Sequence, residues 1–330
     1  MQRLVRIAAT TLGVICTTVA MVVVLGWLIG HIASDRYSWS QWLLWIPTPA
    51  VLLATLLGLA GASRPAKKPR LRRRRLGIWA AIGAAIGVYF TTIEHRFWFR
   101  AAVTDVPGLR LVHWNMSHEK RGRYDAHVEK ILELGGDLTI LSHSIGTRRS
   151  ERLQAWLGES AKPVMVRPFT VLTRLPILEA RALVANDDIL VAMFQIDTSD
   201  RLGQPITVYA VDFPSDLRRS RAEVARTARR LLEDTSAPPP DIVVGDFNMT
   251  RGSASLRMLF PDLEHAYKQA GHGYGASYHR AVPLFHLDHV LLADTVRAST
   301  YELIDPEIGR HLVQVLRLVA TSSSQSRDTQ

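Results

Sequence analysis

Apolar residues are distributed differently in the first hundred residues and in the rest of the chain. Three long apolar runs occupy about 7–32, 40–62 and 76–94. Each approaches the ~20 residues needed to cross a bilayer core, and Trp and Tyr residues stand near their ends, as at membrane interfaces. A cleavable signal peptide is the alternative for the first run, but its apolar part exceeds the usual ~7–15 residues. The pattern predicts three transmembrane helices within residues 1–100.

The charges between these runs predict an orientation. The loop 64–75 carries eight Lys or Arg residues, and basic loops stay on the cytoplasmic side. The N-terminus is then cytoplasmic, and everything after Glu94 is extracytoplasmic. Cys16 is the only cysteine, so a disulfide within the chain is excluded, as is common in bacterial domains of this location. We therefore expect a multi-pass protein of the bacterial cytoplasmic membrane.

From about residue 101 the pattern changes to short apolar runs that alternate with amphipathic stretches, which is typical of a mixed α and β domain over 101–320. The predicted strands cover 109–115, 137–141, a hairpin within 162–177, 189–196, 206–213, 241–248, 284–292 and 311–320. The predicted helices cover 126–136, 216–235 and 255–259. The polar segment 321–330 is predicted to be a disordered tail.

The net charge of +10 belongs to the membrane region. Residues 1–100 hold thirteen basic and two acidic residues, which leaves a net charge of −1 on 101–330. A domain without net positive charge has no general attraction for a polyanion. This makes nucleic acid a less probable substrate than a small phosphoester, a lipid headgroup or a cell-envelope intermediate.

Five motifs lie along the predicted strands. "GDFN" at 245–248 follows three β-branched residues, and "VHWN" at 112–115, "DLTILS" at 137–142, "VLTRLPI" at 171–177 and "FHLDHVLL" at 285–292 occur around it. In their order and spacing they resemble the endonuclease/exonuclease/phosphatase superfamily over about 109–319. The resemblance implies an α+β fold of two β-sheets packed face to face with outer helices, a four-layer sandwich that here follows the three transmembrane helices. It also implies metal-assisted hydrolysis of phosphoesters.

The resemblance assigns roles to five residues. Asp246 matches the residue that orients or deprotonates the attacking water, and Asn248 the residue that donates to the phosphate. Asn115 supports the metal or the phosphate, Asp288 fixes groups of the site, and His311 contacts the phosphate. Asp and Asn at strand ends also make ordinary turns, but the order of the motifs favours a site.

Three positions depart from the family pattern. Ser142 and His143 stand where relatives have Gln and the metal-binding Glu, Asp212 stands where they have a catalytic His, and Arg310 replaces the Asp before the last His. Two interpretations follow. His143 and Asp212 hold a borderline ion such as Zn²⁺ or Mn²⁺ in place of Mg²⁺, or Arg310 and His311 attract a phosphate without any metal.

The function predicted from these residues is that of a membrane-anchored, extracytoplasmic phosphoesterase-like domain with a divergent and impaired site. The alternative is a catalytically inactive module that binds a phosphate or a partner. A further set, His286 and Asp288 on one face of an extended strand together with His143, would suit zinc, with His289 directed away.

Overall fold

The computed structural model of the chain describes residues 2–65, 68–99, 107–117, 119, 122–144, 146–159, 161–186 and 188–321. Most of the predicted tail, residues 322–330, lies outside this set. The chain divides into two compact units. The first comprises Met1–Trp98 and Arg218–Ala222, and the second comprises Phe99–Leu217 and Glu223–Gln330.

The first unit is helical, as the apolar runs predicted. Its elements are α1 Gln2–Ala33, α2 Ser38–Leu44, α3 Thr48–Ala62, α4 Pro69–Val88 and the π-helix η1 Tyr89–Glu94. Leu4–Ala33 and Pro69–Glu94 are each long and apolar enough to cross a membrane. α2 and α3 form a third candidate span if the pair, bent by 71°, is counted as one. The helices therefore provide two or three candidate membrane spans.

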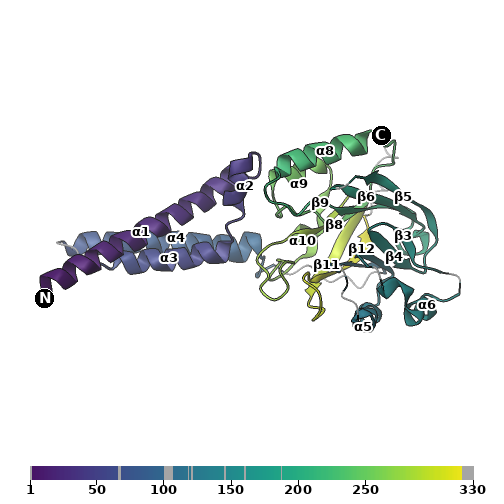
Figure 1. The fold of residues 1–330 in the computed structure, drawn as a ribbon, viewed down its shortest axis with the longest axis horizontal. Helices are drawn as coiled ribbons and strands as arrows, with labels where there is room; N and C mark the ends of the chain where they lie inside the picture. The colour runs from purple at the N-terminus through teal and green to yellow at the C-terminus, as the bar shows by residue number, and fades with distance from the viewer. Residues whose placement is uncertain are drawn as a thin grey trace, which may run out of the picture. The chain divides into compact units, whose positions relative to one another are not determined.

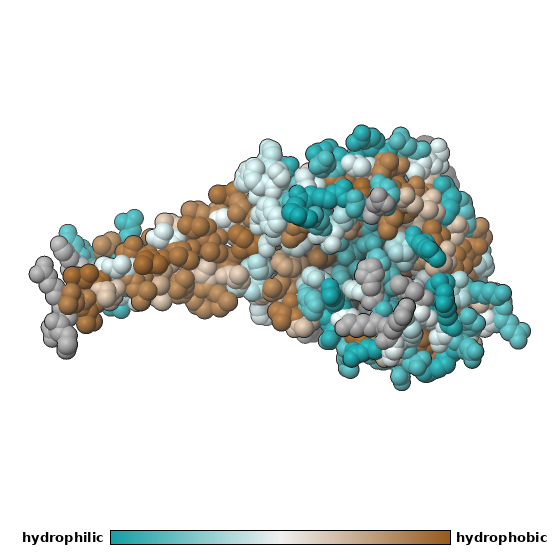
Figure 2. Space-filling view, in the orientation of Figure 1, coloured by the Kyte–Doolittle hydropathy of each residue, from teal (hydrophilic) through white to brown (hydrophobic). Residues whose placement is uncertain are grey.

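The surface of the helical unit suits a lipid environment. Leu12 and Val22 of α1 are 63% and 64% exposed, and the face shown in Figure 2 is apolar along most of these helices. Between α3 and α4, Gly58 lies against the indole of Trp79, where a Cβ would come within 2.5 Å of the ring. Small residues at such contacts let membrane helices pack closely.

Two six-stranded sheets make up the second unit (Figure 1). The first has the order β11-β12-β1-β2-β4-β3, with β11 Val296–Ile304, β12 Val313–Ala320, β1 Leu109–Asn115, β2 Leu138–Ser142, β4 Phe169–Thr173 and β3 Val164–Val166. The second has the order β5-β6-β7-β8-β10-β9, with β5 Ile177–Ala185, β6 Leu190–Ile196, β7 Ile206–Asp212, β8 Ile242–Asp246, β10 Asp288–Leu292 and β9 Glu264–His265.

The sheets pack face to face, with helices on their outer faces. Leu111 and Ile140 of the first sheet share a buried core with Phe194 and Val244 of the second. α5 (Tyr124–Leu134) and α6 (Glu151–Leu157) cover the first sheet, and α8 (Arg221–Glu233) and α9 (Ala254–Leu259) cover the second. Central strands buried on both faces explain the continuous apolar runs. The predicted four-layer sandwich is confirmed. The remaining short helices are η2 Thr147–Arg149, α7 Ser199–Leu202 and α10 Ala266–Ala270.

Three strands that the sequence did not predict lie at sheet edges: β5, β11 and the two-residue β9. β5 and β11 each pair with only one neighbouring strand, and several of their side chains are exposed or half-buried. Their sequences, "ILEARALVA" and "VRASTYELI", carry charges because one side meets water. This weakens the apolar pattern from which a strand is predicted.

Strand pairing brings several strand ends together in the second sheet. β7 and β8 are parallel and pair Asp212 with Asp246, whereas β10 is antiparallel to β8 and begins with Asp288 opposite Asp246. Gly245 allows this close pairing because a Cβ at this position, with φ 150°, would collide with the carbonyl oxygen of Val211 on β7.

We expect Gly245→Ala to destabilise the second unit by about 3 kcal/mol or more, because the backbones of β7 and β8 must separate to admit the methyl group. Thermal unfolding of the full chain in detergent measures the loss. The control is Gly158→Ala, where φ is +86° and a Cβ meets no atom within 4 Å. A loss no larger than in this control would contradict the steric explanation.

Candidate active site

A buried carboxylate, Asp246, is held by groups from both sheets. Its Oδ2 accepts a hydrogen bond from Asn115 Nδ2 at 3.0 Å, and its Oδ1 accepts from the backbone N–H of Asn248 at 2.9 Å. Asn115 ends β1 and Asp246 ends β8, so this contact joins the rims of the two sheets. Asn248 has φ 49°, a conformation that Asn tolerates, and its Nδ2 donates to Phe213 O at 2.9 Å.

Asp288 and His311 form a second buried group beside Asp246. Asp288 Oδ2 accepts hydrogen bonds from His311 Nδ1 at 2.8 Å and from Ser277 Oγ at 2.7 Å. Gln314 Nε2 donates to the backbone carbonyl of Asp288 at 2.9 Å. Ser277 and Gln314 are site residues that no sequence motif predicted. Ser277 lies in an irregular segment, and Gln314 occupies an ordinary polar position of a strand.

Burial and charge set different protonation states for these groups. Burial alone would lower the pKa of His311, but the Asp288 carboxylate raises it to about 9. Burial alone would raise the pKa of Asp288, but the His311 charge and hydrogen bond lower it. Burial raises the pKa of Asp246 well above its ordinary value, and the neighbouring Asp288 charge adds to this. Asp288 and His311 are thus an ion pair, whereas Asp246 takes up a proton more readily.

Two of the three departures from the family pattern, His143 and Asp212, are in contact. His143 Nε2 lies 3.0 Å from Asp212 Oδ2, with side-chain exposures of 19% and 15%. His143 follows β2 with φ 59°, and Asp212 ends β7 beside Asp246. These strand ends therefore carry one imidazole and one carboxylate. His143 stands where the resemblance expects a carboxylate, and Asp212 stands where it expects an imidazole.

The structure brings together most of the predicted site residues, namely Asn115, His143, Asp212, Asp246, Asn248, Asp288 and His311. Arg310 is the exception. It is exposed, and its side chain forms no hydrogen bond or ion pair with any residue described in the structure; its carbonyl accepts from Arg280 N at 2.6 Å. The expected zinc set of His143, His286 and Asp288 is not assembled, because His143 pairs with Asp212 and His286 lies with two other histidines.

Part of this site fits a divalent cation. The ligand atoms of Asp246, Asp288 and His311 lie within 4.8 Å of one another. Asp288 Oδ1 is buried and has no hydrogen-bond partner among the described residues. Two crowded carboxylates with a buried oxygen of this kind suit a hard ion such as Mg²⁺ or Mn²⁺. His311 does not suit it as a ligand, because with a pKa of about 9 both nitrogens of the charged ring carry protons at neutral pH.

Comparison with known proteins defines the class of fold. No family model and no curated protein matches the sequence. Solved structures do match. An endonuclease/exonuclease/phosphatase family protein from Bacteroides thetaiotaomicron is 11% identical, with a TM-score of 0.51 over 64% of this chain and 97% of that one. A mannosyl-6-phosphatase from the same organism is 12% identical, with a TM-score of 0.50 over 64% and 99%.

A conserved protein of unknown function from Enterococcus faecalis is 13% identical, with a TM-score of 0.51 over 64% of this chain and 100% of that one. At such low identity the likeness establishes the architecture. The second unit has the endonuclease/exonuclease/phosphatase fold. In this chain that fold follows an N-terminal unit with two or three candidate membrane spans.

The ion pair predicts a loss of stability at alkaline pH. The pKa of His311 is raised from 6.5 to about 9, so the folded chain holds this proton more tightly than the unfolded chain. The stabilisation is fully present below about pH 6.5 and is lost as the pH rises through about 9. We expect the Tm of the full chain in detergent to fall over this range.

His311→Gln should flatten this fall. At neutral pH it should also cost about 3–5 kcal/mol, because Asp288 loses its charged partner. His272→Asn changes an exposed histidine and should leave the pH profile unaltered. If Tm fell equally with pH in the wild type and in His311→Gln, this would contradict the assignment of the stability loss to the His311 and Asp288 ion pair.

Proposed function

We propose that the second unit hydrolyses phosphoesters. The proposal rests on one arrangement above all: a buried Asp246 held by two Asn residues next to the Asp288 and His311 ion pair. Such a group combines a carboxylate that accepts a proton with a fixed positive charge. Hydrolysis of a phosphoester needs both functions close together.

Each residue has a distinct task in this proposal. Asp246, whose pKa is raised by burial, orients the attacking water and accepts its proton. His311, charged at neutral pH, stabilises negative charge on the phosphate oxygens. Asn115 keeps Asp246 in one orientation. A divalent ion held by Asp288 and Asp246 would neutralise further charge on the phosphate when bound.

The substrate we propose is a small phosphoester at a membrane surface, such as a lipid headgroup or an envelope intermediate. Residues 101–330 have a net charge of −1, which gives no general attraction for nucleic acid. The basic loop 64–75 favours a cytoplasmic N-terminus and an extracytoplasmic second unit. We therefore place the reaction on the outer side of a bacterial cytoplasmic membrane.

Purified full chain in detergent should hydrolyse p-nitrophenyl phosphate or bis(p-nitrophenyl) phosphate with Mg²⁺, Mn²⁺ or Zn²⁺. Asp246→Asn should lower kcat by about 10²–10⁴-fold, the range for loss of a general base. His272→Asn is the matched control and should keep full activity. If no ion supports hydrolysis of either ester, the hydrolase proposal fails.

A second function, binding of a phosphate without turnover, is favoured by the contact between His143 and Asp212. This pair occupies the position at which the resemblance expects the principal metal-binding carboxylate. Calorimetric titration with inorganic phosphate in the presence of a chelator distinguishes the two functions. Metal-independent binding that is weakened by His311→Gln, together with no hydrolysis, would support the binding module.

Two substitutions can restore the residue types that the resemblance expects at positions 143 and 212. His143→Glu alone places a carboxylate next to Asp212 and should lower stability through repulsion of like charges. The double variant His143→Glu with Asp212→His restores one carboxylate and one imidazole in the family order. We expect it to recover the lost stability and to gain affinity for Mg²⁺. A double variant that is no more stable than His143→Glu would show that the two side chains are not coupled.

A further inference from the structure

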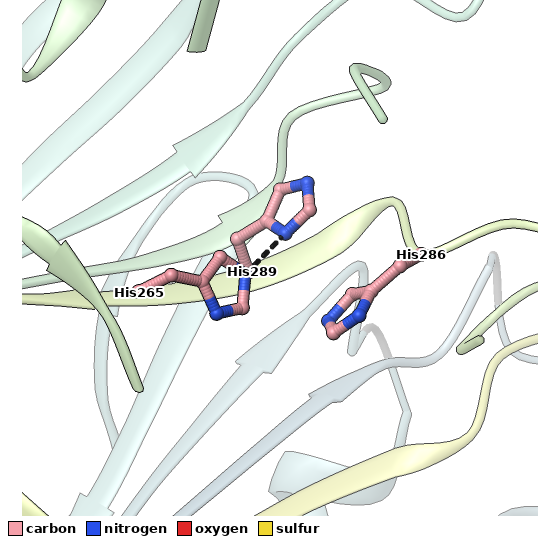
Figure 3. Close-up of side chains that lie close together, drawn as sticks. All are labelled: His265, His286 and His289. Atoms are coloured by element: carbon pink, nitrogen blue, oxygen red, sulfur yellow. Dashed lines mark hydrogen bonds between the residues drawn. The ribbon is translucent and has the colours of Figure 1, made fainter. Parts of the chain in front are cut away.

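Three buried histidines form a cluster (Figure 3). They are a different set of residues from Asp246, Asp288 and His311. They are His265 at the end of β9, His286 just before β10 and His289 on β10, with exposures of 9%, 7% and 0%. Sequence reasoning expected His289 to be directed away from His286. That expectation was wrong, because β10 begins only at Asp288 and His286 does not follow the alternation of a strand.

The three rings are arranged almost as an equilateral triangle. The centroid of His265 lies 5.0 Å from that of His286 and 4.9 Å from that of His289, and the other two centroids are 5.0 Å apart. Their ligand atoms lie within 4.8 Å of one another. Tetrahedral zinc with Zn–N bonds of ~2.0–2.1 Å holds the centroids of three imidazoles roughly 5 Å apart. The spacing of the rings matches that requirement.

We propose that His265, His286 and His289 bind a zinc ion, with water or a small anion in the fourth position. Imidazole nitrogen is a ligand that zinc favours over the oxygen donors preferred by Mg²⁺. This site is separate from the carboxylates around Asp246 and does not depend on the proposed hydrolysis.

Neighbouring groups fix the orientation of two of the rings. His289 Nε2 lies 2.8 Å from the Met249 carbonyl oxygen, which places the ring proton on Nε2 and leaves Nδ1 facing His265. His286 Nε2 lies 3.3 Å from the hydroxyl of Tyr301. Hydrogen bonds of this kind from outside a site orient metal-binding histidines and set their tautomer.

The third ring must change its tautomer when zinc binds. Tyr267 N–H donates to His265 Nδ1 at 3.1 Å, so neutral His265 carries its proton on Nε2 and donates it to His289 Nδ1 at 2.7 Å. Zinc binds His265 Nε2 in place of that proton. The proton moves to Nδ1 of the same ring, and the hydrogen bond from Tyr267 N–H is lost. The two nitrogens separate to about 3.3 Å in a tetrahedral site. Without zinc, His265 and His289 are thus joined by a hydrogen bond. With zinc, the same two nitrogens coordinate the ion.

The charges around the cluster determine how readily a cation enters. Burial lowers the pKa of His265 well below its ordinary value and that of His289 to about 4, so protons do not compete for these rings at neutral pH. The positive charge of Arg251 acts on both rings and opposes a cation. The carboxylate of Asp288 acts on His289 in the opposite sense. An anionic fourth ligand offsets the charge of Arg251.

The test uses the full chain in detergent, stripped with a chelator, dialysed at pH 7.5 and titrated with Zn²⁺. We expect one zinc ion per chain to be retained by the wild type and affinity to fall at least tenfold in His286→Asn. His272→Asn, an exposed histidine near the cluster in sequence, should bind as the wild type does. Asp246→Asn should also retain the ion, which distinguishes this site from the carboxylate site.

Co²⁺ absorption of the wild type tests the geometry without any substitution. A strong visible absorption typical of four-coordinate Co²⁺, lost on addition of Zn²⁺, supports the three-histidine site. The proposal is overturned if the wild type retains no zinc, if His286→Asn binds zinc as tightly as the wild type, or if Asp246→Asn alone abolishes binding. A His286→Asn protein that does not fold is replaced by His265→Asn, for which the same outcomes apply.

Discussion

Repulsion among three carboxylates is the constraint around which the second unit is organised. Asp212, Asp246 and Asp288 occupy paired positions on adjacent strands of one sheet. Each is balanced differently: Asp288 by the charged His311, Asp212 by His143, and Asp246 by two hydrogen-bond donors. Without such partners, buried like charges would separate the strands or take up protons. The two imidazoles at this rim thus support the fold as well as any chemistry.

The same balance explains how the site tolerates changes of residue type. An imidazole and a carboxylate still face each other at the ends of β2 and β7, although each stands where the resemblance expects the other. Exchange of the two preserves the local charge. It alters only which of the two strand ends carries the carboxylate.

Much of the fold and part of the site could be predicted from the sequence. Asp246 and Asn115 could be predicted because each ends a strongly apolar strand. The order of the strands then determines which strand ends lie close together. Arg310 was expected at the site because it precedes His311, but it lies in the bend 307–310 and its side chain is exposed. Ser277 and His265 come from a segment with little regular periodicity, 264–287. Their contacts are fixed by tertiary packing, which no local pattern reports.

The order of strands in the first sheet has a consequence for biosynthesis. Among the described residues, β12 is the last strand and lies between β11 and β1, whereas β1 is the first strand of the unit. The edge of β1 facing β12 therefore has no partner until residues 313–320 have left the ribosome. Exposed edges of this kind invite pairing with other chains, and distant partners in the sequence slow folding. His311 lies two residues before β12, so the charge balance at Asp288 is completed only after the other described strands of the unit have been made.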